Sequence, residues 1–156
     1  MSSQPSHHRL RAEQFALATP DVVEKWQGFG SWDRPYFPSI VGVVVEEVRT
    51  DYCRMRLPFR PDLEQPAGVV HGGAIATLID TVVVPAIGQA YPVGTRYSTV
   101  DMHVQYLSAL VATDAVAEGW IVRRGRTMVF CEAEVLAGDS GRLVARGLLT
   151  YHVSQA

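Results

Sequence analysis

The stretch VVHGGAIATLIDTVVV, residues 69–84, decides the fold of this 156-residue chain. Apolar residues follow the His-Gly-Gly start at the i, i+3, i+4, i+7 spacing of an amphipathic helix. They are Ile75, Leu78, Ile79, Val82, Val83 and Ala86. An apolar face this broad predicts a helix that is largely enclosed by the rest of the domain. Pro85 should kink or weaken the last turns of that helix.

The segments on either side of the helix predict strands. The first is a continuous β-branched run, and the others alternate apolar and polar residues with a period of two. The predicted strands span residues 40–48, 51–59, 99–107, 115–125, 127–138 and 143–153. Two strands, one long buried helix and four antiparallel strands make an α+β fold, with about six strands curved around one helix.

The chain is predicted to be one globular unit with an N-terminal extension. Residues 1–38 are expected to form a helical arm, with short helical pieces at residues 10–18 and 20–29. Residues 39–156 are expected to form the domain proper. The arm should act as a lid or as an interface.

Composition excludes several classes of function. A net charge of −2 gives no electrostatic case for binding nucleic acid or an anionic membrane. Cys53 and Cys131 lack the CxxC spacing of a zinc site or a disulfide framework, so we expect no metal site and a reducing, cytoplasmic setting. We expect both cysteine side chains to pack in the core. The N-terminus lacks the apolar segment of a secretory signal, and no uninterrupted apolar run approaches the ~18 residues of a membrane span.

Asp80 is the unusual residue of the helix, because a carboxylate on an enclosed helix loses hydration unless it is paired. One interpretation places it on an exposed edge with Thr77 and Val84. The other makes it a catalytic base.

The start of the helix favours the catalytic interpretation. Gly68, Gly72 and Gly73 leave the first helical N–H groups uncovered, and these donors suit a carbonyl oxygen that acquires negative charge. The alternative for the His-Gly-Gly sequence is a tight turn that needs positive φ.

An amide that polarises a carbonyl and a carboxylate base are complementary halves of a hydrolytic site. Gly72 and Asp80, however, lie about 12 Å apart along one helix. They can act on the same carbonyl only if they come from different subunits, for example from two antiparallel helices around a two-fold axis. The mechanism therefore requires a homodimer with two equivalent sites.

Four motifs resemble those of the hot-dog-fold acyl-CoA thioesterases, in particular the branch similar to the phenylacetate-degradation thioesterase PaaI. They are GVVHGGAIATLID (68–80), TVDMHVQYL (99–107), RRGRT (123–127) and GRLVARG (141–147). The resemblance runs from roughly residue 40 to residue 153. It implies a curved sheet around the helix and a homodimer that often forms a homotetramer. The substrate it implies is an acyl-CoA, with coenzyme A as part of the substrate and no cofactor.

The same resemblance implies roles for single residues. The Gly72 amide polarises the thioester carbonyl, and Asp80 of the partner chain acts as base or nucleophile. Thr99 orients the attacking water, with Ser98 as a further candidate. The family usually has an asparagine six residues before the histidine, where this chain has Gln65. Glutamine carries the same side-chain amide on a longer side chain, so we expect it to take the same role with altered geometry.

His71 and the arginine-containing turn at residues 124–127 each allow two interpretations. His71 either orients the turn or contacts the substrate beside Gly73. The turn Arg124-Gly125-Arg126-Thr127 is either a solvated hairpin tip or, as the resemblance implies, a site near the phosphates of coenzyme A.

The aromatic residues of the arm also allow two interpretations. They either line an acyl pocket or simply pack onto the sheet. They are Trp26, Trp32, Tyr36 and Phe37.

The sequence thus predicts a thioesterase that hydrolyses an acyl-CoA or aryl-CoA. The alternative is a non-catalytic acyl-CoA-binding or sensing module, because a fold does not fix a function. Asp80 argues against it, since a pure binder has little need for that carboxylate. A hydratase or dehydratase would need a pair of histidine and acid that the sequence does not place.

Overall fold

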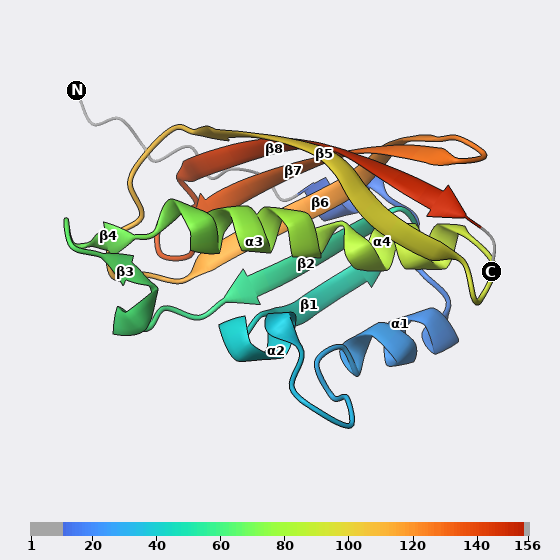
Figure 1. Cartoon of the computed structure of the whole chain (residues 1–156), viewed down its shortest axis with the longest axis horizontal. Coiled ribbons are helices and arrows are strands. Elements are labelled where there is room, and N and C mark those ends of the chain that lie inside the picture. Colours follow the sequence, from blue (N-terminus) through green and yellow to red (C-terminus); the bar gives the residue numbers. More distant parts are fainter. Residues whose placement is uncertain (1–10, 155–156) are drawn as a thin grey trace.

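A computed structural model describes residues 11–154, whose main feature is a curved, fully antiparallel sheet of six strands wrapped around a helix (Figure 1). The strand order is β1-β2-β6-β7-β8-β5. The strands are β1 Val44–Arg49, β2 Tyr52–Leu57, β5 Arg96–Tyr106, β6 Ala115–Arg124, β7 Met128–Ala137 and β8 Leu143–Ser154. The predicted α+β layout is confirmed.

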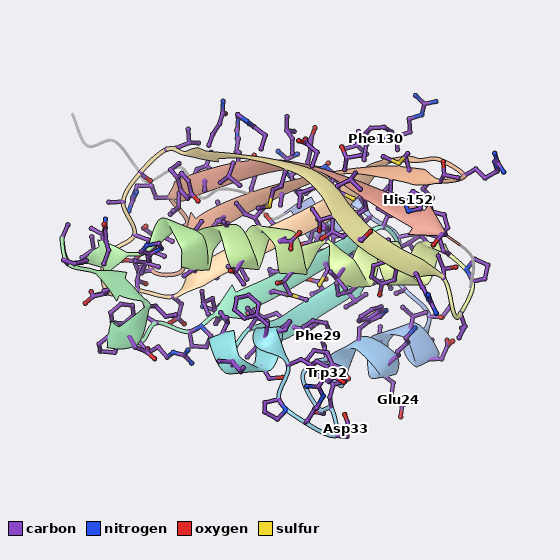
Figure 2. All side chains as sticks on the ribbon, viewed as in Figure 1. Glu24, Phe29, Trp32, Asp33, Phe130 and His152 are labelled. Atoms are coloured by element: carbon purple, nitrogen blue, oxygen red, sulfur yellow. The ribbon has the colours of Figure 1, made fainter. Side chains whose placement is uncertain are left out.

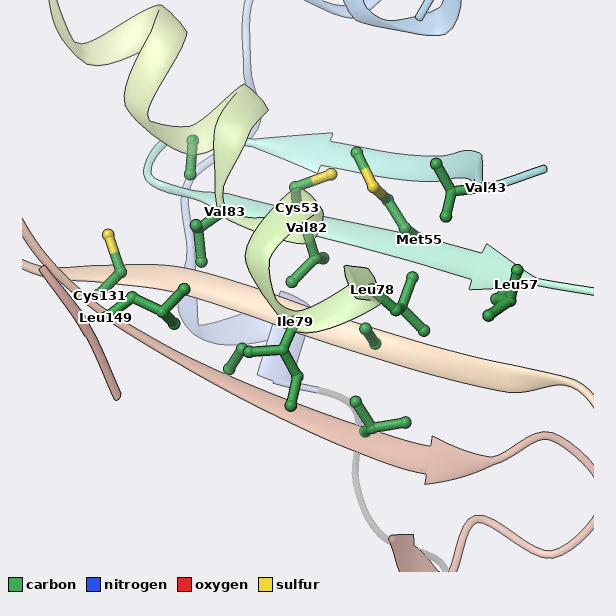
Figure 3. Packing of buried hydrophobic residues seen from close by; sticks show 14 of the residues in the cluster. Val43, Cys53, Met55, Leu57, Leu78, Ile79, Val82, Val83, Cys131 and Leu149 are labelled. Carbon is green, nitrogen blue, oxygen red and sulfur yellow. The ribbon is translucent and has the colours of Figure 1, made fainter. Parts of the chain in front are cut away.

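The central helix has two parts, α3 Gly72–Val82 and α4 Val84–Ala90. The break lies at Val83, two residues before Pro85, which has no backbone N–H to continue the helix. By length and hydropathy these 19 residues would suit a membrane span. The apolar side of the central helix is instead buried against the sheet, as Figure 3 shows for Leu78 and Ile79. This helix is therefore the core helix of the domain.

Small residues on three neighbouring strands let the helix approach the sheet closely. Gly119, Ala133 and Gly147 are paired across strands β6, β7 and β8. A Cβ atom on Gly147 would lie 2.4 Å from Cγ2 of Ile79, and one on Gly119 would lie 2.7 Å from Cγ1 of Val82. This row of small residues therefore fixes where α3 crosses the sheet.

The first predicted strand was partly wrong. Phe37–Val41 form a short helix, α2, and β1 begins only at Val44. Pro38 suits the first turn of a helix, and Gly42 ends it in the left-handed conformation, with φ of 87°. These two residues outweigh the β-branched run that favoured a strand.

The N-terminal segment reaches both sides of the sheet. The first turn, η1 Arg11–Gln14, lies on the outer face, where Phe15 stacks on Tyr52 with ring centroids 5.1 Å apart. The helix expected at residues 10–18 does not continue, because Leu17 forms a β-bridge with Arg49. On the inner side, α1 Pro20–Gln27 buries Trp26 in the main core.

A small β-hairpin leads the chain into the central helix. It consists of β3 Glu64–Gln65 and β4 Val69–Val70, and the short turn η2 Pro61–Leu63 precedes it. Its end is held by two backbone hydrogen bonds, from Val70 N to Leu110 O at 2.9 Å and from His71 N to Leu63 O at 2.8 Å. The start of α3 is therefore fixed to the rest of the fold.

Candidate active site

Asp80 is half-buried, and two hydroxyl groups hold its carboxylate. Thr99 Oγ1 donates to Oδ1 at 2.8 Å, and the Tyr151 hydroxyl lies 2.7 Å from the same oxygen. The Tyr151 hydroxyl also lies 2.8 Å from the backbone oxygen of Asp80. The carboxylate is thus fixed by strands β5 and β8 and is not a freely solvated edge of the helix.

The pairing of β5 with β8 brings Thr99 and Tyr151 together. The two residues are direct cross-strand partners, beside a bulge between Thr99 and Asp101. Bulges of this kind re-aim side chains next to functional sites. Burial, followed by the nearby charge of Asp80, raises the pKa of Tyr151, which therefore remains a protonated donor.

The alternation in residues 143–153 predicted a strand but gave Tyr151 no role at the site. The sequence nevertheless held a signal for its contact with Asp80, because a buried tyrosine hydroxyl needs a hydrogen-bond partner. Asp80 is the acidic residue of the central helix, which packs on the inward face of the strand that carries Tyr151.

His71 is the N-cap of α3, and its Nδ1 accepts a hydrogen bond of 2.8 Å from the Gly73 amide. This geometry supports the structural role for His71. The Gly73 amide is thereby occupied. The Gly72 amide has no acceptor among residues 11–154, so it is the donor that remains open at the start of the helix.

Close packing, and not positive φ, accounts for the two helical glycines. In this segment positive φ occurs at Gly68, where it is 75°, while Gly72 and Gly73 are helical. A Cβ atom on Gly72 would lie 3.2 Å from the ring of Tyr106, whose hydroxyl donates to the Gly72 carbonyl at 2.8 Å. A Cβ atom on Gly73 would lie 2.9 Å from Nδ1 of His71.

Gly72 and Gln65 line the same hollow, which has a volume of about 310 Å³. Tyr106 lies beside them, a neighbour that the sequence analysis missed. Gln65 is exposed on β3, next to the start of the helix. Gln65 therefore lies beside Gly72, and its role in catalysis stays a prediction.

Asp80 faces a different and larger cavity of about 610 Å³. Most of its lining is apolar, and much of it comes from the N-terminal segment and α2. The lining residues are Phe29, Trp32, Tyr36, Phe37, Pro38, Ala76, Thr77, Asp80, Thr81, Val84 and Met102. Three of the four aromatic residues considered for an acyl pocket thus lie there, whereas Trp26 belongs to the core.

The arginine-containing turn lies apart from both hollows. Arg124 forms an ion pair with Asp51, and the Gly125 carbonyl accepts a 2.8 Å hydrogen bond from the Tyr91 hydroxyl. Arg126 and Thr127 are exposed, as is Ser98 on β5. None of these substrate-binding candidates lines the Asp80 cavity.

Possible metal ligands do not gather in the part of the chain that the structure describes. No group of three or more His, Cys, Asp or Glu side chains lies close enough there to hold an ion. His103 lines a groove on the outer face of the sheet, away from Asp80. The chemistry available at the candidate site is that of a carboxylate, hydroxyl groups and a backbone amide.

Known proteins that resemble this chain point to one superfamily. Residues 67–144 match the family model described as "Thioesterase superfamily". A protein of Halobacterium salinarum, named as a candidate esterase, is 36% identical over 103 residues, which cover 63% of this chain and 68% of that protein. The acyl-coenzyme A thioesterase 13 of Mus musculus is 31% identical over 87 residues, or 55% of this chain and 61% of the mouse protein.

Solved structures share the same architecture. A conserved protein of Pseudomonas aeruginosa superposes with a TM-score of 0.71 at 27% identity, over 78% of this chain and 95% of that one. Thioesterase superfamily member 2 of the zebrafish superposes with a TM-score of 0.74 at 24% identity, over 89% and 100% of the two chains. The predicted hot-dog fold is thereby confirmed.

Proposed function

Because this chain belongs to the thioesterase superfamily, we propose that it hydrolyses a thioester of coenzyme A with an acyl or aryl group. The observation that carries this proposal is the Asp80 carboxylate, which two hydroxyl groups hold at the side of an apolar cavity. The cavity would take the acyl group, and the carboxylate would lie beside the thioester carbon. The narrower likeness to the phenylacetate-degradation branch remains a prediction.

The two oxygens of Asp80 would have different tasks. Oδ1 accepts the hydrogen bonds from Thr99 and Tyr151, which leaves Oδ2 for the reaction. As a general base, Oδ2 takes a proton from water while the water oxygen attacks the carbonyl carbon. The C–S bond then breaks, and the proton passes to the sulfur, which gives a carboxylic acid and the free thiol. As a nucleophile, Oδ2 would first attack the carbonyl carbon and displace the thiolate, which forms a mixed anhydride. Water would then cleave the anhydride into the carboxylic acid and the Asp80 carboxylate, and the proton released would pass to the thiolate. Either route needs only water as co-substrate.

The carbonyl-polarising group would come from a second copy of the chain. Gly72 and Asp80 face different hollows and lie about 12 Å apart along one helix. β5 is an edge strand that exposes Val100, Met102 and Tyr106, so it is suited to pair with another chain. In such a dimer each site would join the Asp80 cavity of one protomer to the Gly72 hollow of its partner. A homotetramer would repeat this unit.

The turn between β6 and β7 is our candidate for binding the coenzyme A phosphates. Arg126 is exposed there, whereas Arg124 is paired with Asp51. A guanidinium group suits a phosphate because it donates hydrogen bonds in a planar fork. The expected effect of removing the Arg126 side chain is a raised KM with little change in kcat.

Thiol release from a panel of acyl-CoA and aryl-CoA esters tests the proposal. We expect Asp80→Asn to lower kcat by two or more orders of magnitude while the ester still binds, and the exposed Asp139→Asn to behave like wild type. Both cysteines are buried, so the protein's own thiols should react slowly with the reagent. Binding without any thiol release would indicate the acyl-CoA-binding module instead.

A further inference from the structure

A second cavity adjoins the Asp80 cavity. It has a volume of about 430 Å³ and is lined by Lys25, Trp26, Gly28, Phe29, Trp32, Val84 and Tyr97. Phe29, Trp32 and Val84 also line the Asp80 cavity. Residues that line two cavities lie between them, so these three side chains form a partition.

Aromatic packing holds the partition together. The rings of Phe29 and Trp32 meet edge to face, with centroids 5.0 Å apart and an interplanar angle of 72°. Trp32 makes a similar contact with Tyr36 at 5.3 Å and 84°. Figure 2 shows Phe29 and Trp32 side by side in the N-terminal segment, below the central helix. Val84 is the first residue of α4, so the partition joins the N-terminal segment to the core helix.

The Asp80 cavity offers an acyl chain few hydrogen bonds. The hydroxyl groups of Thr77 and Thr81 line it, but both donate to backbone oxygens of the helix, at 2.9 Å to Gly73 O and 2.7 Å to Thr77 O. The remaining lining is largely aromatic or aliphatic. Discrimination between acyl groups must therefore depend mainly on their size and shape.

We propose that Phe29, Trp32 and Val84 set the maximum length of the acyl group. An acyl group that ends at the partition fits beside Asp80, and a longer one meets the partition before its thioester can reach the carboxylate. The second cavity lies behind the partition and becomes available only when the partition is opened. This inference rests on the proposed function, because it takes the Asp80 cavity as the acyl site.

Truncation of the partition tests the inference. The kcat/KM of the wild type should rise with chain length in a series of straight-chain acyl-CoA esters, by up to about fourfold for each buried methylene group. It should fall once the chain reaches the partition. In Val84→Ala and in Trp32→Ala the maximum should move to longer chains, and Trp32→Phe should produce a smaller shift in the same direction. Trp32 is 40% exposed, so its truncation should leave the fold intact, which circular dichroism will check.

Phe37→Ala is the matched control. Phe37 is apolar, is 62% exposed and lines the Asp80 cavity but not the second cavity. Its truncation should change kcat/KM for all chain lengths without moving the maximum. Hydrolysis with the same maximum in the wild type and the partition variants would overturn this inference alone. No thiol release from any ester would instead overturn the proposed function.

Discussion

The hydroxyl of Tyr151 lies 2.7 Å from Oδ1 of Asp80 and 2.8 Å from the backbone oxygen of the same residue. Tyr151 thereby contacts both the carboxylate and the helix that carries it. Together with Thr99 it fixes the plane of the carboxylate, so that Oδ2 keeps one orientation. Tyr151 is therefore expected to act as a positioning residue for Asp80.

Tyr151→Phe should lower kcat about 10- to 100-fold with little change in KM, because a hydrogen bond to a charged group is worth about 1.5–3 kcal/mol. Tyr52→Phe is the matched control. Tyr52 is also a buried tyrosine, and its hydroxyl donates to Glu118 at 2.6 Å in a cluster with Trp120. Tyr52→Phe should lower the melting temperature and leave kcat unchanged. A Tyr151 variant that changed only stability would refute the positioning role.

Gly147→Ala should destabilise the fold because the added methyl group would lie 2.4 Å from Cγ2 of Ile79. Overpacking of this kind costs about 1–3 kcal/mol, which corresponds to a melting temperature lower by roughly 2–12 °C. Gly28→Ala provides the comparison, since its nearest neighbour would lie 3.5 Å away and its φ is −77°. Differential scanning calorimetry distinguishes the two. Equal melting temperatures would contradict the close approach of α3 to the sheet.

The stability of the protein should decrease at alkaline pH. Burial raises the pKa of the Cys131 thiol from 9.0 to about 12, and burial also raises the pKa of Cys53 and Tyr52. Above pH 9 the unfolded chain loses protons that the folded chain retains, so unfolding becomes easier. The contribution of the neutral Cys131 thiol to the free energy of unfolding is fully present below pH 9 and is lost as the pH rises towards about 12.

Urea unfolding at several pH values measures this effect. Each such group contributes a slope of up to about 1.4 kcal/mol per pH unit. Cys131→Ala should make the decline shallower. A free energy of unfolding that stays constant or increases across this interval would contradict the burial of these groups.

The open amide at the start of α3 can be removed without losing the helix. Gly72 is the first helical residue, where proline is tolerated, and the preceding His71 has the extended conformation that proline prefers, with ψ of 134°. Gly72→Pro should lower kcat by about 10²- to 10³-fold, the usual effect of losing one donor to an oxyanion.

Gly72→Ala controls for crowding against Tyr106, because it adds a Cβ atom but keeps the N–H group. The ratio of the two kcat values isolates the contribution of the amide. Equal rates for the proline and alanine variants would exclude the Gly72 amide from catalysis.

The features that the sequence predicted are those set by local patterns. The apolar repeat from Ile75 to Ala86 indicated the core helix, and the alternation in residues 143–153 indicated a strand with one buried face. Cys53 and Cys131 are buried as expected. Asp80 stood out because a carboxylate on such a helix needs partners.

Contacts between distant segments could not be derived in this way. Tyr151 is 71 residues from Asp80, and their contact depends on the register and bulge between β5 and β8. The contact of Tyr106 with Gly72 likewise spans 34 residues. The wall of the Asp80 cavity depends on α2, a helix whose β-branched residues favoured a strand.

The most direct test of a site shared between two protomers mixes two inactive variants, Asp80→Asn and Gly72→Pro. In a mixed dimer one site carries both defects, whereas the other joins an intact Asp80 to an intact Gly72. Random exchange of equal amounts should therefore restore about a quarter of the wild-type rate per subunit. A mixture no more active than the sum of its two components would contradict the shared site.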